Sequence, residues 1–376
     1  MLRQIMLSTW VLSTAVLAQP QLSPIPSDVP TVANYDVEVL ADDFNQPWGL
    51  SFLPNGAMLV AERSGSVQLL SSDGASRVVL EGTPEAFVNS QAGFFEALPH
   101  PDFANNQWIY LSYAWGTNEE NGLRVARAKL SGNNLIELEV LFTVSPLKSG
   151  GAHYGGRMTF LPDGSLVFGT GEGYNYREHS QRLDSLMGKV IRLNDDGTVP
   201  SDNPFVGRED ARAEIWSYGH RNPQGIVFDT EANVLYVHEH GPKGGDEINV
   251  IEPALNYGWP AITYGTEYSG AQITPYTELD GMIQPMFYYD PSIAPAGFAL
   301  LQNSQFSAWD GDFLIAALAG KELRHVDMEN GQVVGQHRLL TEREERFRDV
   351  RQGPDGAIYV LTDSSEGSLL RLTPAQ

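Results

Sequence analysis

The chain has 376 residues and no cysteine, so it folds without disulfide bonds, and it is long enough to bury a core that does not need them. It carries 24 lysines and arginines against 47 aspartates and glutamates, a formal net charge of −23. So acidic a protein is not expected to bind nucleic acid or anionic membranes, and it favours divalent cations. Any local cluster of arginines therefore requires an explanation.

Residues 1–18 predict a secretory signal peptide. Arg3 supplies a positive charge, an apolar stretch covers residues 5–17, and Val16-Leu17-Ala18 forms a small-residue cleavage pattern. No stretch approaches the ~20 apolar residues that a membrane helix needs. We therefore expect a periplasmic protein without membrane insertion, whose residues 19–376 form a single domain. The alternative is a disordered or buried N-terminal segment.

Six segments then repeat one pattern: a glycine or its equivalent, an alternating apolar strand, a turn and a second apolar strand. The repeats begin at residues 49, 93, 156, 225, 297 and 349, and their second strands are expected at 57–61, 108–113, 165–169, 234–238, 313–317 and 357–362. Asn-Gly and Asp-Gly turns between β-branched and aromatic runs are typical of hairpins. No window shows a sustained helical period. The sequence therefore predicts an all-β protein, a six-bladed β-propeller of four-stranded antiparallel blades. A long β-sandwich is the alternative, which the sixfold recurrence disfavours.

A histidine lies just before the start of the third repeat. His153 precedes Gly155-Gly156, so we expect its imidazole at the mouth of the third blade with little steric cover. A histidine pKa near ~6.5 suits proton abstraction at neutral pH. The alternative is a purely structural histidine.

Arginines gather in two later segments. Arg346 and Arg348 are two residues apart on an expected strand, so their side chains share a face. Together with Arg221 they could bind several carboxylates through paired hydrogen bonds. A solvated or salt-bridged set of arginines is the alternative.

A glycine-rich turn at 241–247 exposes carbonyls and then supplies Asp246 and Glu247. Such oxygen donors favour Ca²⁺. His238 and His240 could bind a transition metal, but the sequence offers no third histidine or cysteine nearby, so zinc is disfavoured there.

Several ordered motifs resemble the soluble pyrroloquinoline-quinone (PQQ)-dependent aldose sugar dehydrogenases, relatives of soluble glucose dehydrogenase. The resemblance covers nearly the whole mature chain. Its most specific pieces are residues 186–193, 219–225, 240–248, 256–260 and 346–356. The fold of that family is a six-bladed propeller, as the repeats predict independently.

The resemblance implies a role for each matching residue. His153 matches the base that takes the proton of the anomeric hydroxyl, and Arg221 matches the arginine that stabilises the developing oxyanion. The implied PQQ contacts are Gln91, Arg221, Asn222, Tyr268, Arg346 and Arg348, with Lys321 the nearest amine to the family's blade-five lysine. Gly241 and Pro242 match the carbonyls that hold the catalytic Ca²⁺, and Glu247 and Tyr257 match ligands of a second Ca²⁺.

The implied partners are an aldose sugar and an external electron acceptor, such as a quinone, a cytochrome or an artificial dye. Two alternative functions keep the fold. One is a binding module without catalysis, which would have no reason to retain both His153 and the arginines. The other is a calcium-dependent lactonase, which would place carboxylates or asparagines around one central metal rather than arginines.

Overall fold

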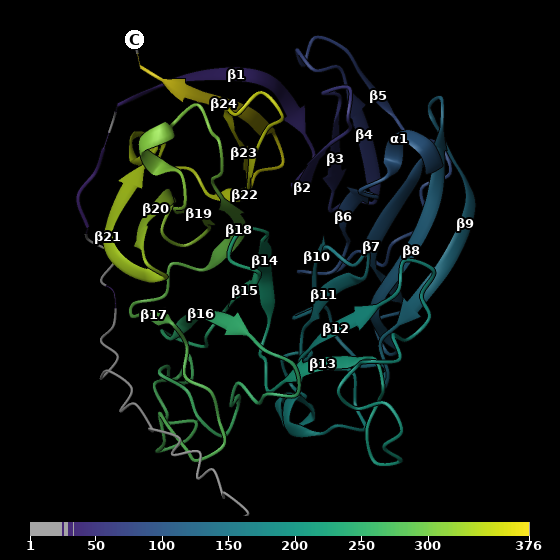
Figure 1. Ribbon diagram of the computed structural model, residues 1–376, viewed down its shortest axis with the longest axis vertical. Coiled ribbons are helices and arrows are strands. Elements are labelled where there is room, and N and C mark those ends of the chain that lie inside the picture. Colours follow the sequence, from purple (N-terminus) through teal and green to yellow (C-terminus); the bar gives the residue numbers. More distant parts are fainter. Residues whose placement is uncertain (1–24, 26–28, 33, 376) are drawn as a thin grey trace, which may run out of the picture.

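The computed structural model describes residues 25, 29–32 and 34–375, so the predicted signal peptide at 1–18 lies outside the described residues. Six four-stranded antiparallel sheets stand as blades around a central axis (Figure 1). The predicted six-bladed, nearly all-β propeller is confirmed. Among the described residues, helical structure is limited to α1 (Phe103–Asn106) and the short 3₁₀ turns Arg177–Gln181, Ser307–Trp309 and Thr341–Arg343.

Five blades are built from strands that follow one another along the chain. The first holds β2 (Pro47–Phe52), β3 (Met58–Glu62), β4 (Ser66–Leu70) and β5 (Arg77–Val79); the second holds β6 (Phe94–Pro99), β7 (Trp108–Gly116), β8 (Asn121–Ser131) and β9 (Asn134–Thr143). The third holds β10 (Gly155–Phe160), β11 (Leu166–Thr170), β12 (Lys189–Leu193) and β13 (Ile215–Tyr218); the fourth holds β14 (Pro223–Asp229), β15 (Val234–Glu239), β16 (Asp246–Ile251) and β17 (Phe287–Tyr289). The fifth holds β18 (Pro295–Leu300), β19 (Phe313–Ala317), β20 (Glu322–Glu329) and β21 (Gln332–Leu339).

The sixth blade joins the two ends of the described chain. It contains β22 (Phe347–Gln352), β23 (Ile358–Thr362) and β24 (Gly367–Pro374), and β1 (Tyr35–Phe44) adds to it as the outermost strand. The β1–β24 pairing runs antiparallel from Tyr35↔Pro374 to Phe44↔Gly367 (Figure 1). This pairing closes the ring, because it ties the beginning of the propeller to its last blade.

The second strand of each predicted repeat lies within a residue or two of its expected start. β19 has the predicted bounds, and β3, β11 and β23 begin one residue later than expected. The repeats were readable because turn residues and apolar alternation are local features of the sequence.

Every innermost strand begins with an irregularity. β2, β6, β10, β14, β18 and β22 lie next to one another around the axis, and each shows a register shift near its first residues. A bulge bends a strand and re-aims the extra residue. Four of the six bulges each contain one residue between the shifted pairs, and these residues are Trp48, Phe95, Gln224 and Arg348. They meet at one end of the axis, as described below.

The core lies between adjacent blades rather than in one central mass. Leu59 and Ala61 of the first blade, for example, pack in one buried cluster with Phe94 and Leu111 of the second. Burial of such side chains stabilises the fold by about 1.5–3 kcal/mol for each large apolar residue. None of the helices among the described residues is long and apolar enough to cross a membrane.

Candidate functional site

A cavity of about 450 Å³ opens at the end of the axis where the innermost strands begin. The bulged residues Trp48, Phe95, Gln224 and Arg348 all line it. The shared irregularity of the innermost strands therefore turns side chains from four blades into one space. This is how a rigid scaffold gathers residues that lie far apart in the sequence.

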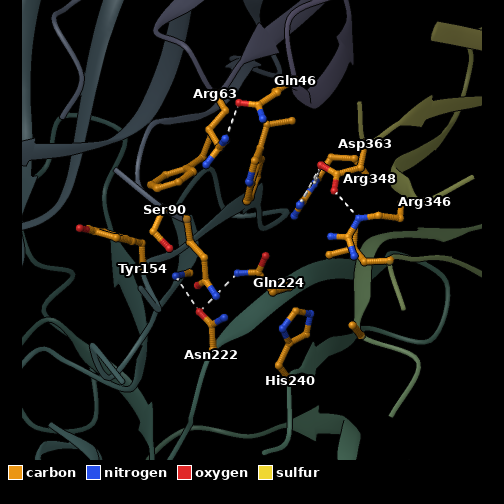
Figure 2. Close-up of a pocket in the computed structure, with 16 residues that line it drawn as sticks. Gln46, Arg63, Ser90, Tyr154, Asn222, Gln224, His240, Arg346, Arg348 and Asp363 are labelled. Carbon is orange, nitrogen blue, oxygen red and sulfur yellow. Dashed lines mark hydrogen bonds and ion pairs between the residues drawn. The ribbon is translucent and has the colours of Figure 1, made fainter. Parts of the chain in front are cut away.

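One wall of the cavity is rich in arginine (Figure 2). Asp363 accepts hydrogen bonds from Arg346 Nε at 2.8 Å and from Arg348 Nε and Nη2 at 3.1 and 3.0 Å. Arg63, on the same cavity, donates to the Gln46 side chain. Burial and the nearby positive charge of Arg348 lower the Arg63 pKa. Three guanidinium groups thus face one carboxylate, which leaves a positive surplus in an acidic protein.

The opposite wall is polar and neutral. Asn222 Oδ1 accepts hydrogen bonds from the Gly155 backbone N–H at 3.1 Å and from Gln224 Nε2 at 3.3 Å, as Figure 2 shows. His240 Nε2 lies 2.7 Å from the Pro295 carbonyl, to which it donates. Gln91 Oε1 accepts a 2.9 Å hydrogen bond from the His153 backbone N–H. Gln91, Asn222, Arg346 and Arg348 are therefore brought together as expected.

His153 lies behind this wall, and the expectation of little steric cover was wrong. The residue is only 4% exposed. The loop after β11 packs against it so closely that a Cβ on Gly171 would lie 2.4 Å from the His153 backbone. The sequence did not reveal this cover, because the packing of Gly171 against His153 is a tertiary contact.

The imidazole of His153 is held in one orientation. Its Nδ1 lies 3.0 Å from Glu172 Oε1, and Nε2 has no hydrogen-bond partner among the described residues, although it is not fully sealed from solvent. Burial lowers the His153 pKa, Glu172 raises it, and the positive charges of Arg221 and Lys148 lower it further. The backbone φ of 53° is rare for a residue other than glycine. A neutral imidazole with Nε2 unprotonated is a competent base.

Arg221 lies beneath the polar wall and ties it to the 241–247 turn. Its Nη1 donates to the His240 carbonyl at 3.0 Å and to the Gly241 carbonyl at 2.6 Å, while its guanidinium lies over the Trp259 ring. Its Nε is buried with no partner among the described residues. One strong donor therefore remains unsatisfied next to His153 and Gly241.

A second, much smaller cavity lies beside this turn, and Gly241, Glu247 and Tyr257 line it together with Arg221 and Glu239. Glu239 and Glu247 stand directly opposite each other on β15 and β16. Burial and the facing Glu239 raise the Glu247 pKa well above its usual range. The Asn249 Oδ1 atom is also buried without a partner among the described residues. Facing carboxylates and an unpaired amide oxygen are a donor set for a hard cation.

The backbone of this turn offers further oxygens. Pro242 is buried, and its carbonyl accepts no hydrogen bond from the described residues. The Tyr257 hydroxyl already donates to the Val250 carbonyl at 2.6 Å and accepts from the Glu252 backbone at 2.8 Å. Any contact of Tyr257 with a cation would therefore use its carbonyl.

Three expected cofactor contacts do not line the cavity: Arg221, which lies beneath its polar wall, Tyr268 and Lys321. Tyr268 is 61% exposed, and Lys321 lies exposed in the turn between β19 and β20; neither lines the cavity. From the loop between β19 and β20 of blade five, Leu318 lines the wall of the cavity instead. The expectations for Tyr268 and Lys321 rested on motif position alone. The path of each loop places the side chain away from the cavity.

Sequence reasoning missed several residues of the cavity. They include Gln46, Trp48, Arg63, Tyr154, Gln224 and Asp363. A signal was present for two of them, because Trp48 and Gln224, like the predicted Arg348, each directly precede the start of a repeat. That position is the bulge of the innermost strand, which re-aims its side chain.

Comparisons with known proteins agree on one family. The family model described as Glucose / Sorbosone dehydrogenase matches residues 44–371. Aldose sugar dehydrogenase YliI of Escherichia coli is 40% identical, and the alignment covers 91% of this chain and 94% of that protein.

Solved structures agree with this. The apo-form of the soluble aldose sugar dehydrogenase of Escherichia coli superimposes with a TM-score of 0.87 at 40% identity, covering 90% of this chain and 99% of that one. The PQQ-bound aldose sugar dehydrogenase of Streptomyces coelicolor superimposes with a TM-score of 0.73 at 26% identity, covering 91% and 99%.

Proposed function

Because the chain belongs to the glucose/sorbosone dehydrogenase family, we propose that it is a PQQ-dependent aldose sugar dehydrogenase that oxidises an aldose at its anomeric carbon to the lactone. The observation that carries this proposal is the arginine-rich cavity beside the buried His153–Glu172 pair. A similar protein with bound PQQ, from Streptomyces coelicolor, supports the choice of cofactor.

The cavity suits a planar cofactor with three carboxylates. Arg346 and Arg348, with Arg63 beside them, would hold carboxylates through charge-assisted hydrogen bonds. Gln91 and Asn222 line the same space and would contact the ring system. When bound, PQQ supplies the acceptor for the hydride that leaves the anomeric carbon. Tyr268 and Lys321 receive no role, because both are exposed and neither lines this cavity or the smaller one beside it.

Cations have two proposed places in this site. The Gly241 and Pro242 carbonyls would hold a catalytic Ca²⁺ against the cofactor, with the Gly241 carbonyl shared with Arg221. Glu247 and the Tyr257 carbonyl would hold a second Ca²⁺, and the facing Glu239 adds a carboxylate. A cation there would relieve the repulsion between the two facing carboxylates.

The catalytic work of the chain falls to His153 and Arg221. Glu172 accepts a hydrogen bond from Nδ1–H, which would leave the lone pair of Nε2 free to take the proton of the anomeric hydroxyl. The lowered pKa keeps the imidazole neutral near pH 7. Arg221 would stabilise the negative charge that develops beside it, in a site where burial strengthens electrostatic interactions.

We also place the reaction in the periplasm, on the basis of the signal-like residues 1–18. Electrons would leave to an external quinone, cytochrome or artificial dye. A binding module or a calcium-dependent lactonase with the same fold is disfavoured by the pairing of His153 and Glu172 with a positive cavity.

Reconstitution tests the proposed function directly. Protein stripped by chelation should reduce dye with an aldose only after both PQQ and Ca²⁺ are added. Each additive alone should give little activity, and a lactone should be the product. Full dye reduction by the stripped protein without PQQ would overturn the proposal.

The role of His153 has its own test. His153→Gln should lower the rate of quinone reduction in a single turnover by roughly 10²–10⁴, the span that general-base catalysis supplies. Measuring a single turnover keeps reoxidation by the dye from masking this step. His100→Gln is the control, since His100 lies outside the cavity near Asp195. A parental rate in His153→Gln would assign the base to another residue.

A further inference from the structure

A cluster of histidines and aspartates, residue types that commonly bind metals, lies on blade five, outside the cavity already described. Asp312 directly precedes β19, His325 and Asp327 belong to β20, and His337 belongs to β21. None of the four lines the arginine-rich cavity. From their arrangement we propose that blade five carries a structural transition-metal site of the zinc type.

The facing atoms lie at separations close to those around a bound ion. His325 Nε2 is 2.8 Å from Asp312 Oδ2 and 3.3 Å from Asp327 Oδ1, and His337 Nε2 is 3.1 Å from Asp327 Oδ2. A tetrahedral ion with bonds of about 2.0–2.1 Å separates its ligand atoms by about 3.3 Å. Small outward movements of these side chains would therefore admit the ion between them.

The ligand atoms of Asp312, His325 and Asp327 lie within 4.8 Å of one another, and His337 joins them through Asp327. His325 and His337 are direct cross-strand partners, and Asp327 is two residues from His325, on the same face of β20. Asp312 Oδ1 accepts a 2.7 Å hydrogen bond from the Met328 backbone N–H, which leaves Oδ2 to face His325. The pairing of β20 with β21 is irregular between Asp327 and Met328, so the backbone next to Asp327 departs from regular strand geometry.

Gly335 leaves room for the Asp327 carboxylate. The two residues are cross-strand partners, and a Cβ on Gly335 would lie 2.3 Å from Asp327 Oδ2. Gly335 does not have a positive φ, so its backbone conformation does not require glycine. Its small size instead allows the carboxylate to turn toward the histidines.

The charges of the cluster also call for a cation. Asp312 is 7% exposed, and in the described part of the chain the ion pairs of Asp312 and Asp327 involve only the two histidines. Two carboxylates therefore share a partly buried site that has no lysine or arginine partner among the described residues. Buried charge without a partner is costly, and one divalent ion would neutralise both carboxylates.

The types of ligand atom favour one class of metal ion. Two imidazole nitrogens favour zinc and its transition-metal neighbours, whereas Ca²⁺ and Mg²⁺ prefer sites built entirely from oxygen. An adjoining cavity of about 360 Å³, lined by all four residues and by Trp309, gives an ion a path of entry.

The position of the cluster gives the metal a structural role. An ion held by these residues would link the start of β19 to β20 and β21. The N-terminal segment runs along the same edge, where Val32 N–H donates to the Arg338 carbonyl at 3.0 Å and Arg338 N–H donates to the Pro30 carbonyl at 2.8 Å. Binding should therefore raise the thermal stability of the propeller rather than its activity.

Zinc titration of tag-free, Ca²⁺-saturated protein tests this inference. Calorimetry should show one equivalent of Zn²⁺ bound, with a higher Tm, and excess Ca²⁺ should not compete. His337→Gln and Asp327→Asn should each weaken binding by about tenfold or more. Because His337 is one-third exposed, its variant keeps the test valid even if Asp327→Asn fails to fold.

Two further variants separate this site from adventitious binding. Gly335→Ala should weaken Zn²⁺ binding without removing a ligand, since its methyl group would displace the Asp327 carboxylate. His100→Gln, which removes another histidine near a carboxylate, should bind as the parent does. Equal affinity and stoichiometry in the parent, His337→Gln and Asp327→Asn would overturn the inference, and so would a parent that binds no Zn²⁺ at micromolar concentration.

Discussion

Two clusters of arginines meet at β22, and they differ in charge balance. In the inner cluster, Arg157 and Arg351 meet Glu96 and Asp349, two cations against two anions. Arg157 Nη1 lies 2.9 Å from Asp349 and 3.5 Å from Glu96, and Arg351 Nε lies 3.2 Å from Asp349. Arg157 also donates to the Trp48 and Gln224 carbonyls. This cluster joins β6, β10 and β22 and has no charge left over.

The outer cluster borders the cavity and is unbalanced. Arg63, Arg346 and Arg348 face the single carboxylate of Asp363. The two clusters even share a strand, because Arg348 and Asp349 are adjacent on β22 and the bulge between Phe347 and Asp349 sends Arg348 outward. The comparison teaches that surplus charge, rather than the presence of arginine, marks the proposed binding site.

The largest expected effect comes from unbalancing the inner cluster. Arg157→Ala would leave Glu96 and Asp349 buried with Arg351 as their remaining arginine partner, and removing one member of a buried ion pair costs about 3–5 kcal/mol. The free energy of unfolding, measured by urea denaturation, should fall by that amount. A loss below about 1 kcal/mol would show that the inner cluster does not hold the blades together.

Removing charge from the outer cluster should affect cofactor binding more than the stability of the fold. Arg348→Ala should weaken PQQ binding by about 1.5–3 kcal/mol, the worth of a charge-assisted hydrogen bond, and should change the free energy of unfolding much less than Arg157→Ala does. Fluorescence titration of PQQ would measure the loss. An unchanged titration would remove Arg348 from the binding site.

Arg346 should contribute less than Arg348 to the same affinity. Its side chain is 46% exposed, against 12% for Arg348, so solvent screens its charge. Arg346→Ala should weaken PQQ binding by no more than about 1 kcal/mol, and added salt should reduce the difference from the parent. A loss equal to that of Arg348→Ala would mean that exposure does not rank the two arginines.

The smallest effect is a shift in pH dependence. Burial lowers the His153 pKa, so the acidic limb of the kcat/KM profile should have its midpoint below 6.5. Activity falls as protonation removes the base. Lys148 adds to the lowering through its positive charge, so Lys148→Met should move the limb to higher pH. Lys129, which is partly exposed and paired with Glu137, supplies the control variant, Lys129→Met, which should leave the limb in place. An unmoved limb in Lys148→Met would exclude Lys148 from tuning this base.

Much of the fold was predictable because its signals are local. The repeat at 297–317 shows this, since the Asp310-Gly311 turn and the apolar run after it place β19 at its observed bounds. The site was predictable in part. Gln91, Asn222, Arg346 and Arg348 reach one cavity as the family resemblance implied, whereas Tyr268 does not, because its motif position says nothing about the path of its loop.

The sequence by itself determined the number of blades, the family and the identity of the arginines, because turn residues, strand alternation and ordered motifs are written within short stretches of chain. Only the tertiary structure decided which arginines are neutralised and which face the cavity, that His153 is buried against Glu172, and that Asp312, His325, Asp327 and His337 meet on blade five. These outcomes depend on bulges that re-aim single side chains and on contacts across the closed ring, such as the hydrogen bond from Leu50 to Asp349 across 299 residues. Closure of the ring sets those contacts, and no short stretch of sequence specifies it.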